Sequence, residues 1–106
     1  MSELEYEMGS GNVFADLGFA EAETELARAE LAHRIATIIE DRALTQAAAA
    51  ALMGINQPMV SALVRGHLED FSLERLAAYL IALGHDVEIV VRPAGDEARL
   101  HVSVAR

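Results

Sequence analysis

The spacing of a few residues between positions 45 and 63 constrains the fold of this 106-residue chain most strongly. Counted from Gln46, a small residue comes four positions later, a glycine eight positions later, and aliphatic residues at three further positions. In chain order these are Ala50, Gly54, Ile55, Val60 and Leu63. A small residue lets two helices touch, a glycine permits a tight turn, and the aliphatics supply an inner face. The pattern therefore predicts two short helices joined by a turn at Met53, Gly54 and Ile55.

Three further patterns place helices around this pair. Apolar residues recur at helical spacing in residues 21–41, with Leu31, Ile35, Ile38 and Ile39 on one face and Leu26 and Ala27 before them. Three residues are expected to cap the later helices at their N-termini, namely Thr45, Asn56 and Ser72. Pro58 suits a first turn, and Val60, Leu63 and Val64 are expected to face inward until Gly66 ends that helix. A fourth helix is expected to end at Gly84, with its apolar face formed by Leu73, Leu76, Ala77, Leu80 and Leu83.

Beyond Gly84 the apolar residues alternate, which is typical of β-strands. One predicted strand contains Val87, Ile89 and Val91, and a second contains Leu100, Val102 and Val104. Residues 93–97 between them include Pro, Gly and Asp and suit a hairpin. Because an isolated hairpin is marginally stable, we expect the first strand to pair with a second copy of the chain. The alternative is a strand that packs back on the chain's own helices.

The sequence therefore predicts a mainly α domain with one or two C-terminal β-strands, in three segments. Residues 1–20 form an acidic, partly flexible arm, residues 21–84 form the helical domain, and residues 85–106 form a β segment that makes a dimer. The predicted dimer surface consists of Leu80, Leu83, Val87, Ile89 and Val91.

Charge is distributed unevenly along the chain. The formal net charge is −9, with 17 acidic residues against 8 basic residues, all of which are arginine. Residues 42–68 contain two arginines and no acid, so this part alone is basic. Because local potential decides where a polyanion docks, residues 42–68 are compatible with nucleic acid despite the acidic total.

Composition excludes several classes of protein. A chain of this length forms one domain, and its 53% hydrophobic residues indicate a folded protein. No apolar run is long enough to span a membrane and no signal peptide is recognisable, so we expect a soluble, cytoplasmic protein. There is no cysteine, no phosphate-binding loop and no recognisable nucleophile, and His33, His67, His85 and His101 lack the spacing of metal ligands. We therefore expect neither catalysis nor a metal or cofactor.

The two short helices and their turn are built like a helix-turn-helix unit, which favours DNA binding over a purely structural hairpin. Residues 46–65 resemble the helix-turn-helix of the lambda-repressor-like XRE regulators, and more narrowly of HigA-type antitoxins. Four further segments are similar to that branch in order and spacing: SGNVFADLGF (10–19), LAHRIATIIEDRALTQ (31–46), FSLERL (71–76) and DVEIVVRP (86–93). The resemblance implies a dimer that binds an operator in its own promoter and neutralises a RelE-like, mRNA-cleaving toxin.

The resemblance also implies which residues approach DNA, since the second helix of the unit enters the major groove. The implied set is Gln46, Asn56, Gln57, Met59, Ser61 and Arg65. Gln57 suits adenine, Gln46 suits a phosphate, and Arg65 and Arg42 are further candidates for phosphates. The chain departs from the family at Met59, where relatives often carry lysine, and in residues 47–51, which lack the family's acid. Met59 is expected either to touch a thymine methyl or to make no contact with DNA.

The acidic N-terminal arm suggests how a basic toxin could be bound. Its apolar side chains are candidates for anchoring in the toxin surface, or else for covering the first helix: Tyr6, Val13, Phe14, Leu17 and Phe19. Two other functions stay open, a stand-alone XRE regulator without a toxin and a pure protein-interaction module. A basic protein encoded in the neighbouring reading frame would favour the antitoxin.

Overall fold

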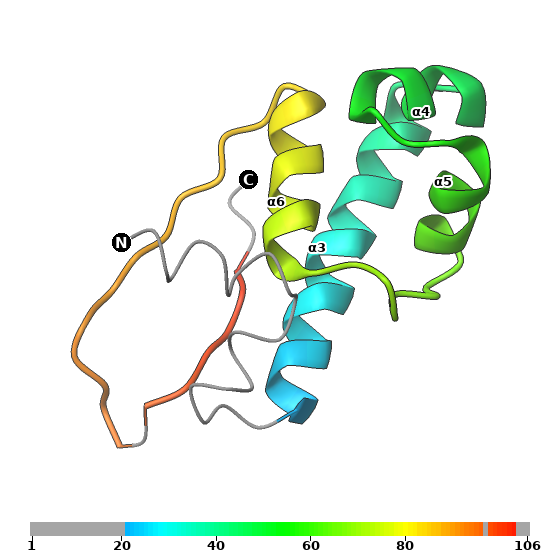
Figure 1. Cartoon of the computed structure of the whole chain (residues 1–106). Coiled ribbons are helices and arrows are strands. Elements are labelled where there is room, and N and C mark those ends of the chain that lie inside the picture. Colours follow the sequence, from blue (N-terminus) through cyan, green and yellow to red (C-terminus); the bar gives the residue numbers. More distant parts are fainter. Residues whose placement is uncertain (1–20, 97, 104–106) are drawn as a thin grey trace, which may run out of the picture.

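The computed structural model describes residues 21–96 and 98–103, and within them the chain folds into four helices (Figure 1). These are α3 (Glu21–Asp41), α4 (Gln46–Met53), α5 (Gln57–Val64) and α6 (Leu73–Ala82). The long helix α3 contacts both α5 and α6, while α4 contacts α5 and α6. Figure 1 shows α6 lying beside α3, with α4 and α5 grouped near the C-terminal end of α3. The predicted mainly helical fold is confirmed.

The N-termini of α4, α5 and α6 are fixed by their own side chains. In each helix the cap side chain accepts a hydrogen bond from the backbone N–H three residues later, at 3.0 Å for Thr45, 2.8 Å for Asn56 and 3.2 Å for Ser72. Such caps satisfy amides that have no partner inside the helix, and each stabilises a helix by about 1 kcal/mol. The three predicted caps are confirmed.

The turn between α4 and α5 depends on a left-handed backbone conformation at Gly54. Its φ is 74°, and its N–H donates to the carbonyl oxygen of Ala50 at 2.8 Å, as does the N–H of Ile55 at 3.1 Å. A side chain disfavours this conformation, so glycine is the residue expected here. After α3 the same region of backbone is occupied by Ala43, with φ 54°.

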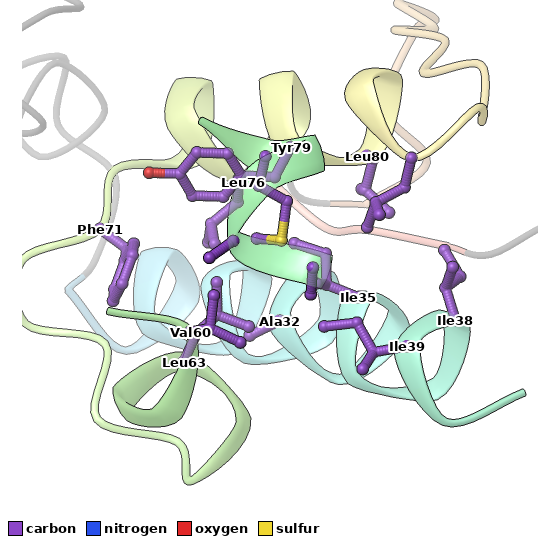
Figure 2. Close-up of a cluster of buried hydrophobic side chains, with 14 residues drawn as sticks. Ala32, Ile35, Ile38, Ile39, Val60, Leu63, Phe71, Leu76, Tyr79 and Leu80 are labelled. Atoms are coloured by element: carbon purple, nitrogen blue, oxygen red, sulfur yellow. The ribbon is translucent and has the colours of Figure 1, made fainter. Parts of the chain in front are cut away.

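The core lies where α3, α4, α5 and α6 meet (Figure 2). Its four largest fully buried side chains are Ile35 of α3, Val60 and Leu63 of α5, and Leu76 of α6. Each such side chain contributes roughly 1.5 to 3 kcal/mol through removal of apolar surface from water. Packing against the core thus fixes the orientation of α5.

Two predicted inward positions are exposed. Leu26 is 63% exposed and Val64 is 37% exposed. On the two turns of α5, Val60 and Leu63 already define the buried face, and Val64 lies about 100° further round the helix than Leu63. The inward assignment of Val64 was therefore wrong, and so was that of Leu26.

The predicted strands are absent from residues 85–96 and 98–103, which the structure describes without any strand. Val104 lies outside the described residues. Ile89 and Val91 are 87% and 91% exposed, so the apolar side chains of the alternating pattern do not pack against any surface of the described chain. A strand is stabilised by hydrogen bonds to a neighbouring strand, and residues 85–91 have no such neighbour in the described part of this single chain.

Helices α3 and α6 are joined at their C-terminal ends by a long-range contact. Arg42 follows α3 directly, and its Nη1 donates to the carbonyl oxygen of Leu83 at 2.9 Å. Carbonyl groups at a helix end have no partner inside the helix, so a guanidinium is a suitable donor there. Arg42 therefore fixes the point at which the C-terminal segment leaves the helices.

None of the described helices is by itself long and apolar enough to cross a membrane. Helices α4 and α5 meet the length and composition requirement only when they are taken together.

Candidate nucleic-acid interface

Helices α4 and α5 meet at 104°, across a turn of the three residues between Met53 and Gln57. This angle falls within the roughly 90–120° of helix-turn-helix units. The five spacing positions serve as predicted: Ala50, Val60 and Leu63 are buried, Ile55 is half-buried, and Gly54 turns the chain. The turn starts one residue later than predicted, because Met53 is still helical.

The outer face of α5 lies opposite Val60 and Leu63. At 100° per residue, four side chains lie within about 50° of the outermost line of the helix. These are Pro58, Ser61, Ala62 and Arg65, of which Pro58 and Arg65 are exposed and the other two are half-buried. Gln57 is exposed in the first turn of the helix. This is the face that a DNA groove would meet.

Sequence reasoning missed two members of this outer face, Pro58 and Ala62. Pro58 was assigned only a role in starting the helix, and Ala62 was not considered. The signal was available, because Pro58 lies almost opposite the buried pair when the helix is projected down its axis, and Ala62 lies about 50° from that outermost line. Met59 lies on the flank of α5, and both Met59 and Ala62 pack partly against the core.

The other predicted DNA-contacting residues are placed as follows. Gln46 is the exposed first residue of α4. The Asn56 side-chain oxygen accepts from the N–H of Met59, so that oxygen already serves as the helix cap. The Arg65 Nε donates to the carbonyl oxygen of Ser61 at 3.3 Å, which uses one of the five donors of its guanidinium. Gln57 is exposed at the N-terminus of α5.

Arg42, predicted as a candidate for a phosphate, has a structural contact as well. One of its nitrogens is bonded to the carbonyl oxygen of Leu83, although the residue as a whole is exposed. The anchoring of α6 explains this arginine without any ligand.

The helix-turn-helix unit itself carries no charge. No Asp, Glu, Lys or Arg occurs in residues 43–64, and Arg42 and Arg65 lie just outside its two ends. A polyanion approaching α5 therefore meets neither repulsion from acids nor a dense basic patch.

The residues predicted for protein contacts are separated by the structure. Leu80 and Leu83, which were predicted to belong to the dimer surface, are buried in the chain's own core, at 5% and 3% exposure. Val87 is 36% exposed, and Ile89 and Val91 are more exposed still. The predicted toxin contacts, Tyr6, Val13, Phe14, Leu17 and Phe19, lie outside the described residues.

Within residues 21–96 and 98–103, no three His, Asp or Glu side chains come together in a group that could hold a metal ion.

A pair of short helices crossing near a right angle, with an exposed second helix held by a buried inner face, defines a helix-turn-helix protein. The model of the helix-turn-helix domain family matches residues 13–92. This chain therefore belongs to the XRE-like helix-turn-helix family, whose members are DNA-binding regulators and not enzymes.

Two similar proteins narrow the comparison. The chain is 46% identical over 74 residues to a protein of Mycobacterium tuberculosis (strain ATCC 25618 / H37Rv) named "Putative antitoxin HigA3". That match spans 67% of this chain and 66% of the relative. A solved structure titled "Putative XRE Family Transcriptional Regulator" superposes with a TM-score of 0.74 at 45% identity, covering 82% of this chain and 99% of the other. The predicted resemblance to the HigA and XRE proteins is confirmed.

Proposed function

We propose that this protein is the DNA-binding antitoxin of a HigBA-like toxin–antitoxin pair, which represses its own promoter as a dimer. The observation that carries the DNA-binding part is the 104° crossing of α4 and α5, with the outer face of α5 uncovered. The antitoxin part is supported by the 46% identity to the HigA3 relative. Because the operator is chromosomal DNA, this proposal places the protein in the cytoplasm.

In this proposal α5 enters the major groove and Gln57 reads a base. A glutamine side chain offers a paired donor and acceptor that matches the N6 and N7 edge of adenine. Gln46 and Arg65 contact phosphates on either side and set the position of the helix. A dimer of this kind binds an inverted repeat with half-sites about 34 Å apart.

Binding of purified protein to operator DNA tests this arrangement. Gln57→Ala should weaken specific binding by about 1 to 3 kcal/mol and leave non-specific binding nearly unchanged. Gln46→Ala is the matched control. It should weaken specific and non-specific DNA binding alike, because a phosphate contact carries no sequence information. Equal operator affinity of Gln57→Ala and the unchanged protein would contradict the groove assignment.

The dimer of this proposal forms through residues 87–91. Ile89 and Val91 are almost fully exposed, and their alternation with Glu88 and Val90 suits a strand. A strand from a second copy would satisfy the backbone groups and cover the aliphatic face at once. Light scattering at micromolar concentration should give about twice 11.4 kDa, and a monomer there would reject the dimer.

Toxin binding is assigned to the N-terminal arm, on the basis of its sequence alone. Residues 1–20 contain four acidic residues and no basic residue, which would attract a basic, RNA-cleaving enzyme, and the five apolar residues named above would anchor in its surface. A deletion of residues 1–19 should keep operator binding and lose rescue of cells arrested by the toxin. If the deleted protein rescues fully, the contact lies on the helical body. Phe14→Ala, with its helix content checked by circular dichroism, repeats the test without shortening the chain.

The second candidate is a stand-alone regulator without a toxin. The similarity to the solved XRE regulator supports it, since that protein is described as a transcriptional regulator and its fold covers 82% of this chain. A basic protein of roughly 100 residues encoded next to this one, toxic when expressed alone, would favour the antitoxin. Its absence would favour the stand-alone regulator.

A further inference from the structure

The chemistry of α5 restricts which bases it can read. In the major groove, guanine is recognised most often by Arg or Lys at O6 and N7, and cytosine by Asp or Glu at N4. Residues 43–64 contain none of these four residue types. The helix that faces the groove therefore lacks the usual readers of a G·C pair.

Arg65 does not restore guanine reading. It lies eight residues after Gln57, about 12 Å further along the helix axis. This distance is about the width of the major groove, so an arginine there reaches the phosphates when Gln57 lies over the bases. Its Nε is also bonded to the carbonyl oxygen of Ser61, which holds the start of the guanidinium close to the helix end.

Apart from Ser61, which is half-buried, the remaining outer surface of α5 is apolar. Pro58 and Ala62 are four residues apart, so their side chains lie one above the other on the same face. Pro58 is exposed, and Ala62 packs partly against the core while the rest of its surface stays open. The 5-methyl group of thymine is the apolar group that bases present in the major groove, and alanine is among the residues that contact it.

We infer that α5 recognises adenine·thymine pairs, with Gln57 on an adenine and Pro58 and Ala62 on the methyl groups of neighbouring thymines. The inference deepens the proposed operator binding and rests on it. It assigns part of the sequence specificity to two side chains that form no hydrogen bond with a base.

The test begins with selection of binding sites from randomised duplex DNA by the full-length protein. The expected half-site has A·T pairs at the positions under α5. Each of its thymines is then replaced by deoxyuridine, which removes only the methyl group. Replacement under Pro58 or Ala62 should weaken binding about fourfold, the effect of roughly 0.8 kcal/mol for one methyl-sized apolar group. The same replacement outside the half-sites should have no effect.

The possible outcomes distinguish failure of methyl recognition from failure of the proposed operator binding. Selection of G·C pairs under α5, or equal binding of thymine and uracil half-sites, overturns methyl recognition while operator binding stands. Failure to select any sequence overturns operator binding itself.

A protein variant assigns the contact to its side chain. Pro58→Gly removes the ring and leaves no side chain that could contact a methyl group, and circular dichroism checks that the helix content is kept. It should abolish the thymine-over-uracil preference at one position of each half-site and retain it at the other. The chain has only one other proline, Pro93, so Pro93→Gly is the matched control and should retain both preferences. A preference that survives Pro58→Gly at both positions overturns the assignment to Pro58.

Discussion

Residues 46–64 and residues 85–91 differ sharply in what they need in order to fold. Both have a regular apolar pattern, yet only the first forms regular structure in the single chain. Helices α4 and α5 close their hydrogen bonds within their own sequence, and the side chains of Thr45 and Asn56 complete their first turns. A strand cannot do this, because its hydrogen-bonding groups point to a neighbour.

An apolar pattern therefore predicts a conformation only when the fold also provides a surface against which the apolar side chains can pack. Val60 and Leu63 have a partner surface on α3, and both are buried. Ile89 and Val91 have the same kind of side chain and remain exposed. Residues 85–91 thus have the alternating sequence of a strand, and the proposed second copy of the chain would supply the neighbouring strand that they lack.

The largest expected effect is the difference in stability loss between truncating a side chain in the helical core and truncating one in residues 85–91. Leu76→Ala should lower the free energy of unfolding by about 2 to 5 kcal/mol, because Leu76 is fully buried and its removal leaves a cavity. Ile89→Ala should change it by less than about 0.5 kcal/mol in the monomer, since Ile89 is exposed there. Urea unfolding followed by circular dichroism, at a concentration where the protein is monomeric, measures both. A large loss for Ile89→Ala would mean that residue 89 packs on its own chain.

The next prediction concerns how two copies pair. Centring an antiparallel pair on Ile89 places Val87 opposite Val91 and Asp86 of one copy opposite Arg92 of the other. Opposite charges in such cross-strand pairs contribute about 0.2 to 1 kcal/mol each, and the two-fold symmetry makes two of them.

Charge reversal tests that register. Asp86→Arg should weaken the dimer about tenfold, because it replaces attraction with repulsion at both symmetric positions. The double variant Asp86→Arg with Arg92→Asp should restore the affinity, as measured by sedimentation equilibrium. If Asp86→Arg weakens the dimer and the double variant does not restore its affinity, this register is contradicted.

A smaller effect is expected at the turn between α4 and α5. Gly54→Ala should lower the free energy of unfolding by about 1 kcal/mol, because φ is 74° and a side chain disfavours that backbone. A Cβ atom there would have no atom within 4 Å, so the loss is conformational and not steric with neighbours. Thermal unfolding measures it, and an unchanged melting temperature would contradict it.

The smallest effect is the reverse change after α3. Ala43 has φ 54° and carries a side chain in the same region of backbone. Ala43→Gly should raise the free energy of unfolding by at most about 0.5 kcal/mol, since relief of strain is partly offset by the greater freedom of glycine when unfolded. Urea unfolding in parallel with Gly54→Ala makes the two changes a matched pair, and destabilisation by Ala43→Gly would show that its backbone is unstrained.

The sequence predicted those features that depend on neighbouring residues. Thr45, Asn56 and Ser72 were assigned as caps because a cap bonds to an amide only three residues away. The turn at Gly54 was predicted because glycine permits a tight turn, and the burial of Ala50 because a small residue lets two helices come into close contact.

Features that depend on the whole fold were predicted less well. Val64 was placed inward because the apolar pattern does not state how much of a short helix will be covered. Arg42 was considered as a phosphate contact, and its bond to the carbonyl oxygen of Leu83 was not foreseen because that acceptor is 41 residues away. Met59 was favoured over Pro58 and Ala62 by family comparison, whereas the helix geometry places the latter two on the outer face of α5.

The bond between Arg42 and Leu83 also bears on the spacing of operator half-sites. It holds the start of the C-terminal segment against the end of α3, a helix that packs on α5. In the proposed dimer, joined through that segment, this bond would limit how far the two recognition helices can move relative to one another. One base pair inserted between half-sites turns one of them by about 34° around the duplex. A dimer held in this way would not follow that rotation, so the length of the operator would matter as well as its sequence.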